Sequence, residues 1–133
     1  MTPLQLSQEL WKLGLRITTE KRWVEYKTQE FSLYDRNTFP ARWSGREYPA
    51  YSTEELLEVL PAKLIKNNRD YWFHITFVGM REYSVYYGDI LKKKIMLNFE
   101  DKSLSDALGL MCKYLLENGY TYNPENGLRK DSK

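Results

Sequence analysis

The chain has only one cysteine and one histidine, Cys112 and His74, among its 133 residues. A lone cysteine cannot form a disulfide within the chain, and this pair cannot supply the tetrahedral ligand set of a structural zinc site. A catalytic thiolate would need His74 as its neighbouring base. The apolar spacing around Cys112 instead predicts a buried, inert thiol that lies apart from the imidazole. We therefore expect no catalytic dyad, metal site or cofactor.

Phosphate-binding and nuclease signatures are also lacking. The seven glycines are scattered and form neither G-x-G-x-x-G nor G-x-x-x-x-G-K. Asp89 and the sequence Glu100-Asp101-Lys102 have the acid…E-x-K order of many metal-dependent nucleases. A predicted hairpin places about five strand residues, or ~16 Å, between Asp89 and Glu100, which is too far to share a magnesium ion. These absences favour a protein that is not an enzyme.

Strong charge and long apolar runs are missing as well. The formal net charge is +2, whereas nucleic-acid-binding proteins gather many more Lys and Arg on one face. No apolar run approaches the length of a membrane span. The first residues, MTPLQLSQELWKLG, lack the basic region and continuous apolar stretch of a signal peptide. We expect a cytoplasmic protein without membrane association.

What the chain does have is the pattern of a small α+β domain. Apolar residues at helical spacing predict helices between residues 2 and 14, 52 and 61, and 103 and 119. Leu6, Leu10 and Leu13 repeat on one face of the first helix, for which Thr2 is the predicted cap. Ser52 and Glu55 have the spacing of a capping box, and Ser103 is the predicted cap of the last helix. Alternating segments predict strands at residues 22–35, a short strand near residue 64, and an antiparallel meander over residues 70–99. The predicted fold for residues 1–120 is a single domain, an antiparallel meander packed with about three helices and similar to an α-β-α sandwich. Residues 121–133 are expected to be a frayed polar tail.

The meander begins with DYWFHITFVGMREYSVYYG, residues 70–88, and period-two alternation gives it two faces. Phe73, Ile75 and Phe77 share one face, on which the last helix is predicted to pack. The apolar row of that helix consists of Leu104, Ala107, Leu108, Met111, Cys112 and Leu115. Trp72, His74 and Tyr86 share the other face, where they form a candidate surface for stacking on a base or nucleotide. The alternative is that a second helical layer covers this face, and the usual burial of tryptophan favours that alternative.

A second aromatic and basic segment, residues 36–51, contains several breakers of regular structure. Arg, Trp and Tyr are the residue types that dominate protein interfaces, and long irregular loops are often functional. The candidate binding residues are Arg36, Arg42, Trp43, Arg46, Tyr48 and Tyr51. Two structural alternatives remain for this segment, a covering flap or a third edge strand through residues 44–48.

The order of three motifs resembles a known family. LSQELWKLG (6–14), YPAYSTEELLEVLP (48–61) and SLSDALGLMCKYLLENGY (103–120), with an aromatic meander before the last, resemble small phage- and prophage-encoded proteins of the phage ABA sandwich group. The resemblance implies an accessory protein of a bacterial virus or integrated element, in the cytoplasm of a bacterial host, with a sheet between helical layers. It carries over no catalytic residues.

The leading functional hypothesis is a non-enzymatic accessory protein that binds a protein partner through Arg42, Trp43 and Arg46. One alternative is a protein that binds or sequesters nucleotides or nucleotide-derived signals with Trp72, Tyr86 and the loop arginines. Another is single-stranded nucleic-acid binding, which would be steeply salt-dependent. Homo-oligomer formation also stays open, because an exposed strand edge or aromatic patch can pair two copies.

Overall fold

The computed structural model describes residues 1–26, 30–35, 43–79, 81–89 and 94–130. The described residues form three helices, α1 (Leu4–Lys12), α2 (Thr53–Val59) and α3 (Leu104–Glu117). They also form three antiparallel sheets, which are given below. These elements confirm the predicted α+β class and the antiparallel meander packed with helices.

The largest sheet has four strands in sequence order: β4 (Lys63–Lys66), β5 (Arg69–Val78), β6 (Glu82–Asp89) and β7 (Lys94–Asp101). A three-stranded sheet has β1 (Lys21–Tyr26) between β2 (Phe31–Asp35) and β3 (Trp43–Ala50). The last sheet is a hairpin of β8 (Tyr120–Asn123) and β9 (Gly127–Lys130). The short strand predicted near residue 64 is β4, and all strands of the predicted meander are present.

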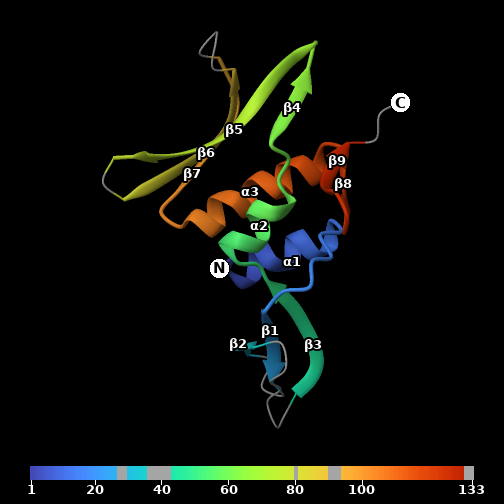
Figure 1. The fold of residues 1–133 in the computed structure, drawn as a ribbon. Coiled ribbons are helices and arrows are strands. Elements are labelled where there is room, and N and C mark those ends of the chain that lie inside the picture. The colour runs from blue at the N-terminus through green and yellow to red at the C-terminus, as the bar shows by residue number, and fades with distance from the viewer. Residues whose placement is uncertain (27–29, 36–42, 80, 90–93, 131–133) are drawn as a thin grey trace.

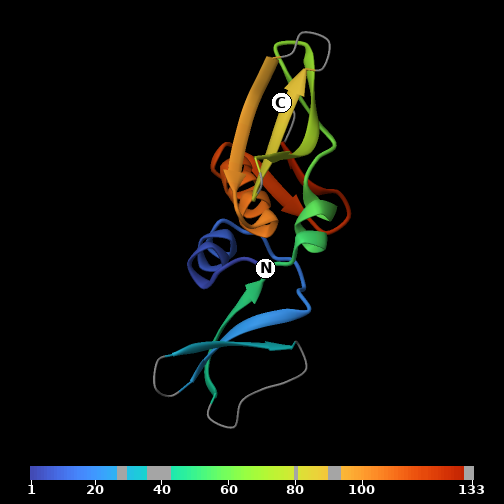
Figure 2. The same cartoon turned by 90° about the vertical axis from the view of Figure 1, so that its left-hand side faces the viewer.

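The helices lie between the two larger sheets (Figures 1 and 2). α3 packs on β6 and β7 on one side and contacts α1 and α2 on the other, while α1 packs against β3. The resemblance to the phage group implied the reverse order, with a sheet between helical layers. In this structure the outer face of the four-stranded sheet has no helix over it, and the side chain of Trp72 is 44% exposed. The expectation of a layer covering Trp72 is therefore wrong for the described residues.

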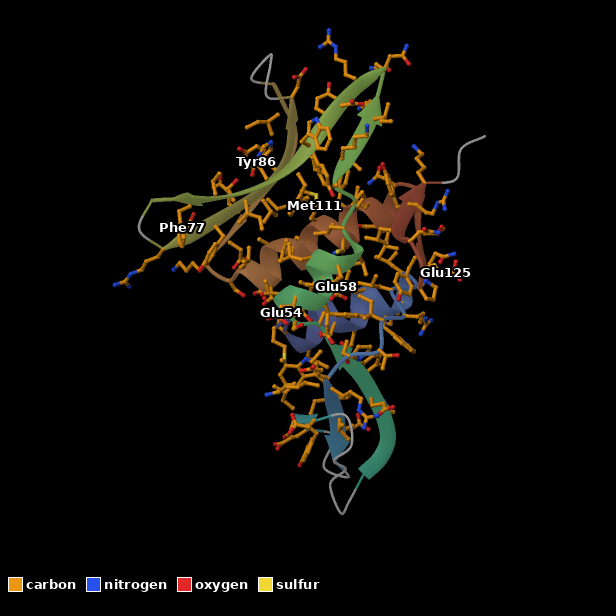
Figure 3. The ribbon with its side chains drawn as sticks, viewed as in Figure 1. Glu54, Glu58, Phe77, Tyr86, Met111 and Glu125 are labelled. Atoms are coloured by element: carbon orange, nitrogen blue, oxygen red, sulfur yellow. The ribbon has the colours of Figure 1, made fainter. Side chains whose placement is uncertain are left out.

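The core forms where α3 meets β6. The predicted apolar row of α3 is confirmed, since Ala107, Leu108, Met111, Cys112 and Leu115 are all buried. Val85 and Tyr87 of β6 face this row and are also buried. Met111 lies between the sheet and the helices (Figure 3). Apolar burial at this junction stabilises the fold by roughly 25 cal/mol per Å² removed from water.

Two of the three helices begin at the capping residues that the sequence predicts. Ser52 and Glu55 form the predicted capping box: the Ser52 Oγ accepts from the Glu55 amide at 3.2 Å, and the Glu55 Oε1 accepts from the Ser52 amide at 2.9 Å. Ser103 caps α3 as predicted. α1 differs, because Pro3 rather than Thr2 is its N-cap. The Thr2 Oγ1 is buried and accepts from the Tyr51 amide at 3.0 Å, which ties the start of the chain to the end of β3.

Residues 120–130 form a hairpin where the sequence predicted that residues 121–133 are frayed. Tyr120–Asn123 and Gly127–Lys130 pair as the β8–β9 hairpin, which contacts α2 and α3. Leu128 in this hairpin is buried in the core. Leu128, together with Tyr120 and Tyr122 packed against the same core, thus anchors a segment that is otherwise polar.

The prediction for the apolar face of β5 is only partly right. Phe73 packs against the core and its ring lies 5.3 Å from that of Tyr87. Ile75 and Phe77 lie farther along the strand and are exposed, Phe77 by 68%. Figure 3 shows Phe77 at the end of the β5–β6 hairpin, away from the helices. The reason is that α3 packs on β6 and β7 and leaves the outer end of β5 uncovered.

Candidate functional site

The aromatic and basic segment 36–51 is largely a strand in its second half. β3 pairs with β1 in an antiparallel register, with Tyr48 opposite Trp23, which supports the edge-strand interpretation. Arg46 is exposed, and its Nε lies 3.5 Å from Oε2 of Glu25. Arg36, Arg42 and the side chain of Trp43 lie outside the described residues.

The two tyrosines of this candidate site have different environments. Tyr48 is partly exposed, and its ring centroid lies 5.9 Å from that of Phe31. Tyr51 is fully buried, and its hydroxyl donates to the backbone carbonyl of Leu15. Burial also raises the pKa of Tyr51 above its ordinary value. Tyr51 is therefore a core residue and does not belong to a contact surface.

The candidate stacking residues lie together on the outer face of the four-stranded sheet. His74 and Tyr86 are cross-strand neighbours whose rings stack with centroids 5.0 Å apart. Trp72 lies two positions along the same face of β5, and the Lys63 Nζ lies 5.4 Å from its ring centroid. In Figure 3, Tyr86 lies on the side of the sheet turned away from the helices. This face is partly aromatic and open to solvent.

The structure does not assemble the predicted nucleotide site from its described parts. Trp72 and Tyr86 belong to the four-stranded sheet, whereas Arg46 belongs to the three-stranded sheet on the other side of the helices (Figures 1 and 2). A base stacked on Trp72 would therefore have its phosphate far from Arg46. Any ligand on either surface must be bound by the residues of that surface alone.

The side chains that could act together in catalysis, Cys112 with His74 and Asp89 with Glu100, also lie apart. Cys112 is fully buried, and burial raises the pKa of its thiol, so that it stays protonated at neutral pH. His74 points to the opposite side of the sheet from Phe73 and Tyr87, which face the core. In the register of β6 and β7, Asp89 lies opposite Lys94 and Glu100 lies opposite Ser84, at the other end of the pair. The predicted separations of both pairs are confirmed.

Exposed apolar side chains concentrate on the four-stranded sheet. We call this set the outer apolar cluster, and its side chains are 39% to 68% exposed. Its members are Ile65, Trp72, Ile75, Phe77 and Ile95. Ile65 and Trp72 lie on the face turned away from the helices, whereas Ile75 and Phe77 lie on the helix side of β5, beyond the part that α3 covers. The Phe77 and Tyr83 rings meet with centroids 4.6 Å apart. Ile75 and Phe77 were predicted to lie in the core, and Ile65 and Ile95 were not predicted site residues.

A second feature is a groove of about 260 Å³ between the end of α1 and β3. Trp11, Arg16 and Arg22 line it together with Tyr48. The Arg16 guanidinium carbon lies 3.6 Å from the centroid of the Trp11 ring. Only Tyr48 among these residues was a predicted site residue. The others come from separate segments and share no motif, so that only the packing of α1 against β3 brings them together.

No helix among the described residues is long and apolar enough to cross a membrane. The described residues also contain no group of three or more His, Cys, Asp or Glu side chains placed to hold a metal ion. Comparisons of the chain with protein-family models, with curated proteins and with solved structures find no match. The resemblance to the phage ABA sandwich group thus stays a prediction.

Proposed function

We propose that the protein is a non-enzymatic accessory protein that binds a protein partner through the outer apolar cluster. The observation that supports this proposal is the exposure of five large apolar side chains on a single sheet. Scattered apolar residues are normal on a protein surface, but exposed apolar residues that adjoin one another, as Ile75 and Phe77 do on one face of β5, are typical of an interaction site. The Phe77 ring, with 68% of its surface in water, would gain most from a partner.

Backbone groups add to this surface. β7 is an edge strand that pairs with β6 and, among the described strands, with no other. An edge strand presents unpaired amide and carbonyl groups, so a partner strand can extend the sheet while its side chains contact Ile95. Aromatic side chains such as Trp and Phe are enriched in the buried centre of protein interfaces. Exposed apolar side chains and an open strand edge on the same sheet therefore both support protein recognition.

The segment around Arg46 and Tyr48 is a second candidate surface for the same function. It lies on β3, on the other side of the helices, so the two surfaces can be tested separately. The resemblance to phage-encoded accessory proteins supports a binding role but favours neither surface.

A photo-crosslinking amino acid at position 77 tests the proposal. In an extract of the source cells we expect a discrete protein adduct at position 77 and none at position 33. Leu33 is the matched control, because it is 39% exposed but lies on β2 of the other sheet. Adducts of equal yield at both positions would show that the crosslinking is non-specific and would contradict the proposal.

Competition identifies the surface. Excess wild-type protein should abolish the adduct at position 77, whereas an excess of the double variant Ile75→Ser, Phe77→Ser should not. The double variant is expected to fold, because both side chains are exposed and surface substitutions change stability little. A double variant Trp43→Ala, Arg46→Ala should compete as well as the wild type. The reverse pattern would assign the partner to the β3 surface instead.

A further inference from the structure

The groove between α1 and β3 lies on the opposite side of the helices from the outer apolar cluster, and it is independent of the proposed function. Its volume of about 260 Å³ is below the range of about 300–1,000 Å³ that is typical of pockets for drug-sized ligands. The occupant that it fits is therefore small. Because the groove is open to solvent, a ligand can enter without any movement of the fold.

The charges of the groove favour an anion. The ionisable side chains that line it are Arg16, Arg22 and Glu47. Arg22 pairs with Glu47, with an Nη1–Oε2 distance of 2.8 Å, so these two charges largely cancel. Arg16 is exposed, and no ion pair to it is found within the described part of the chain. One net positive charge is left for a ligand.

Arg16 is also oriented for binding. One face of its guanidinium lies over the Trp11 ring, at 3.6 Å from the ring centroid. A stacked arginine is held by this cation–π contact, while its N–H groups at the edge stay available as donors. Those donors have the planar geometry that matches a carboxylate or phosphate.

The remaining walls favour a flat apolar group. Tyr48, Pro49 and Ile17 line the groove beside the arginines. Tyr48 and Ile17 are partly exposed, whereas Pro49 is buried, and a planar ring stacks well on a tyrosine ring. Glu47 adds a carboxylate that can accept a hydrogen bond from a polar ring substituent. The lining thus offers an anion contact and a ring contact within a single small volume.

We propose that this groove binds a small aromatic anion, a planar ring that carries one carboxylate or phosphate group. Arg16 binds the anionic group, and the ring lies against Tyr48 and Ile17. Both contacts are needed for measurable affinity, because a single exposed charge contact is worth little in water. The same chemistry is found in nucleoside monophosphates and in aromatic carboxylates, and the test separates these two sources.

The Trp11 indole N–H signal in proton–nitrogen correlation spectra reports on binding, and a Trp11→Phe variant assigns it among the four tryptophans. The probes are adenosine monophosphate and indole-3-acetate, which carry both groups, and adenosine and inorganic phosphate, which carry one group each. We expect a saturable shift of the Trp11 signal in the low millimolar range or tighter with at least one of the first two probes. Adenosine and inorganic phosphate should give no saturable shift in that range. The probe that binds more tightly identifies the anionic group that the groove prefers.

Substitution of Arg16 gives the second measurement. Arg16→Gln should raise the dissociation constant about tenfold or more, because it removes the charged donors. Lys12→Gln is the matched control, since Lys12 is an exposed cation at the end of α1, four residues before Arg16, and does not line the groove. It should leave the dissociation constant within about twofold. Absence of a saturable shift with both two-group probes, or equal effects of the two substitutions, would overturn the proposal.

Discussion

Replacing Gly127 with alanine is expected to lower the free energy of unfolding by roughly 3–5 kcal/mol. Gly127 begins β9 with a φ of +71°, a conformation that is unfavourable for residues with a side chain. A Cβ at this position would lie 2.7 Å from the carbonyl oxygen of Val59 and 2.9 Å from its Cα. These are backbone atoms, so no side-chain rotation can relieve the overlap, and the hairpin must move away from α2.

Gly79→Ala is the control for this prediction. Gly79 has nearly the same φ, +70°, but an added Cβ there would meet no atom within 4 Å. At this position only the backbone strain of a positive φ applies, so we expect the free energy of unfolding to fall by about 1–2 kcal/mol. Urea unfolding of both variants measures the difference. Equal losses would mean that the β8–β9 hairpin does not pack against α2 as the structure has it.

Leu10→Ala is expected to destabilise the protein by about 2–5 kcal/mol. Leu10 is fully buried and belongs to the core cluster that joins α1 to the rest of the molecule. Truncation to alanine loses the transfer free energy of the leucine side chain and leaves a cavity that its neighbours fill only in part. Thermal or urea unfolding followed by tryptophan fluorescence gives the magnitude.

Leu13→Ala is the control on the same segment. Leu6, Leu10 and Leu13 were predicted to share the buried face of α1, but Leu13 is 36% exposed and lies just after the last residue of the helix. Its truncation should lower stability by less than about 1 kcal/mol. If Leu13→Ala destabilised the protein as much as Leu10→Ala, the placement of α1 in the structure would be wrong.

The helices and the strand pattern were predictable because they depend on local rules. The apolar row of α3 and the capping box at Ser52 require only the periodicity and the residues at a helix end. The pairing of β5 with β6 followed from their alternation and the turn between them. In each case the information lies within about 20 neighbouring residues.

Burial along β5 was not predictable in the same way. Alternation correctly assigned Phe73, Ile75 and Phe77 to one face, but it does not indicate how far the covering helix extends. β5 has 10 residues and spans about 33 Å, whereas α3 has 14 residues and spans about 21 Å. The longer strand therefore reaches beyond its cover, and Phe77 lies on the uncovered part.

The C-terminal hairpin and the groove were missed for a related reason. The tail has a single strongly apolar residue in its second strand, Leu128, and composition alone does not show that the core has a place for it. The groove is formed by residues from α1, the segment after it, β1 and β3. Only the packing of the three-stranded sheet against α1 brings Arg16 close to Tyr48, and no spacing in the sequence encodes that proximity.

The central claim is that the helices cover only part of one side of the four-stranded sheet and leave the outer apolar cluster in water, with Phe77 beyond the end of α3 and Trp72 on the face that has no helix over it. Hydroxyl-radical footprinting with mass spectrometry tests this most directly, because it measures the solvent accessibility of individual side chains. In the isolated monomer we predict rapid oxidation of Phe77 and Trp72, and protection of Met111, whose thioether is intrinsically more reactive but fully buried. Protection of Phe77, or rapid oxidation of Met111 in the folded protein, would contradict the account.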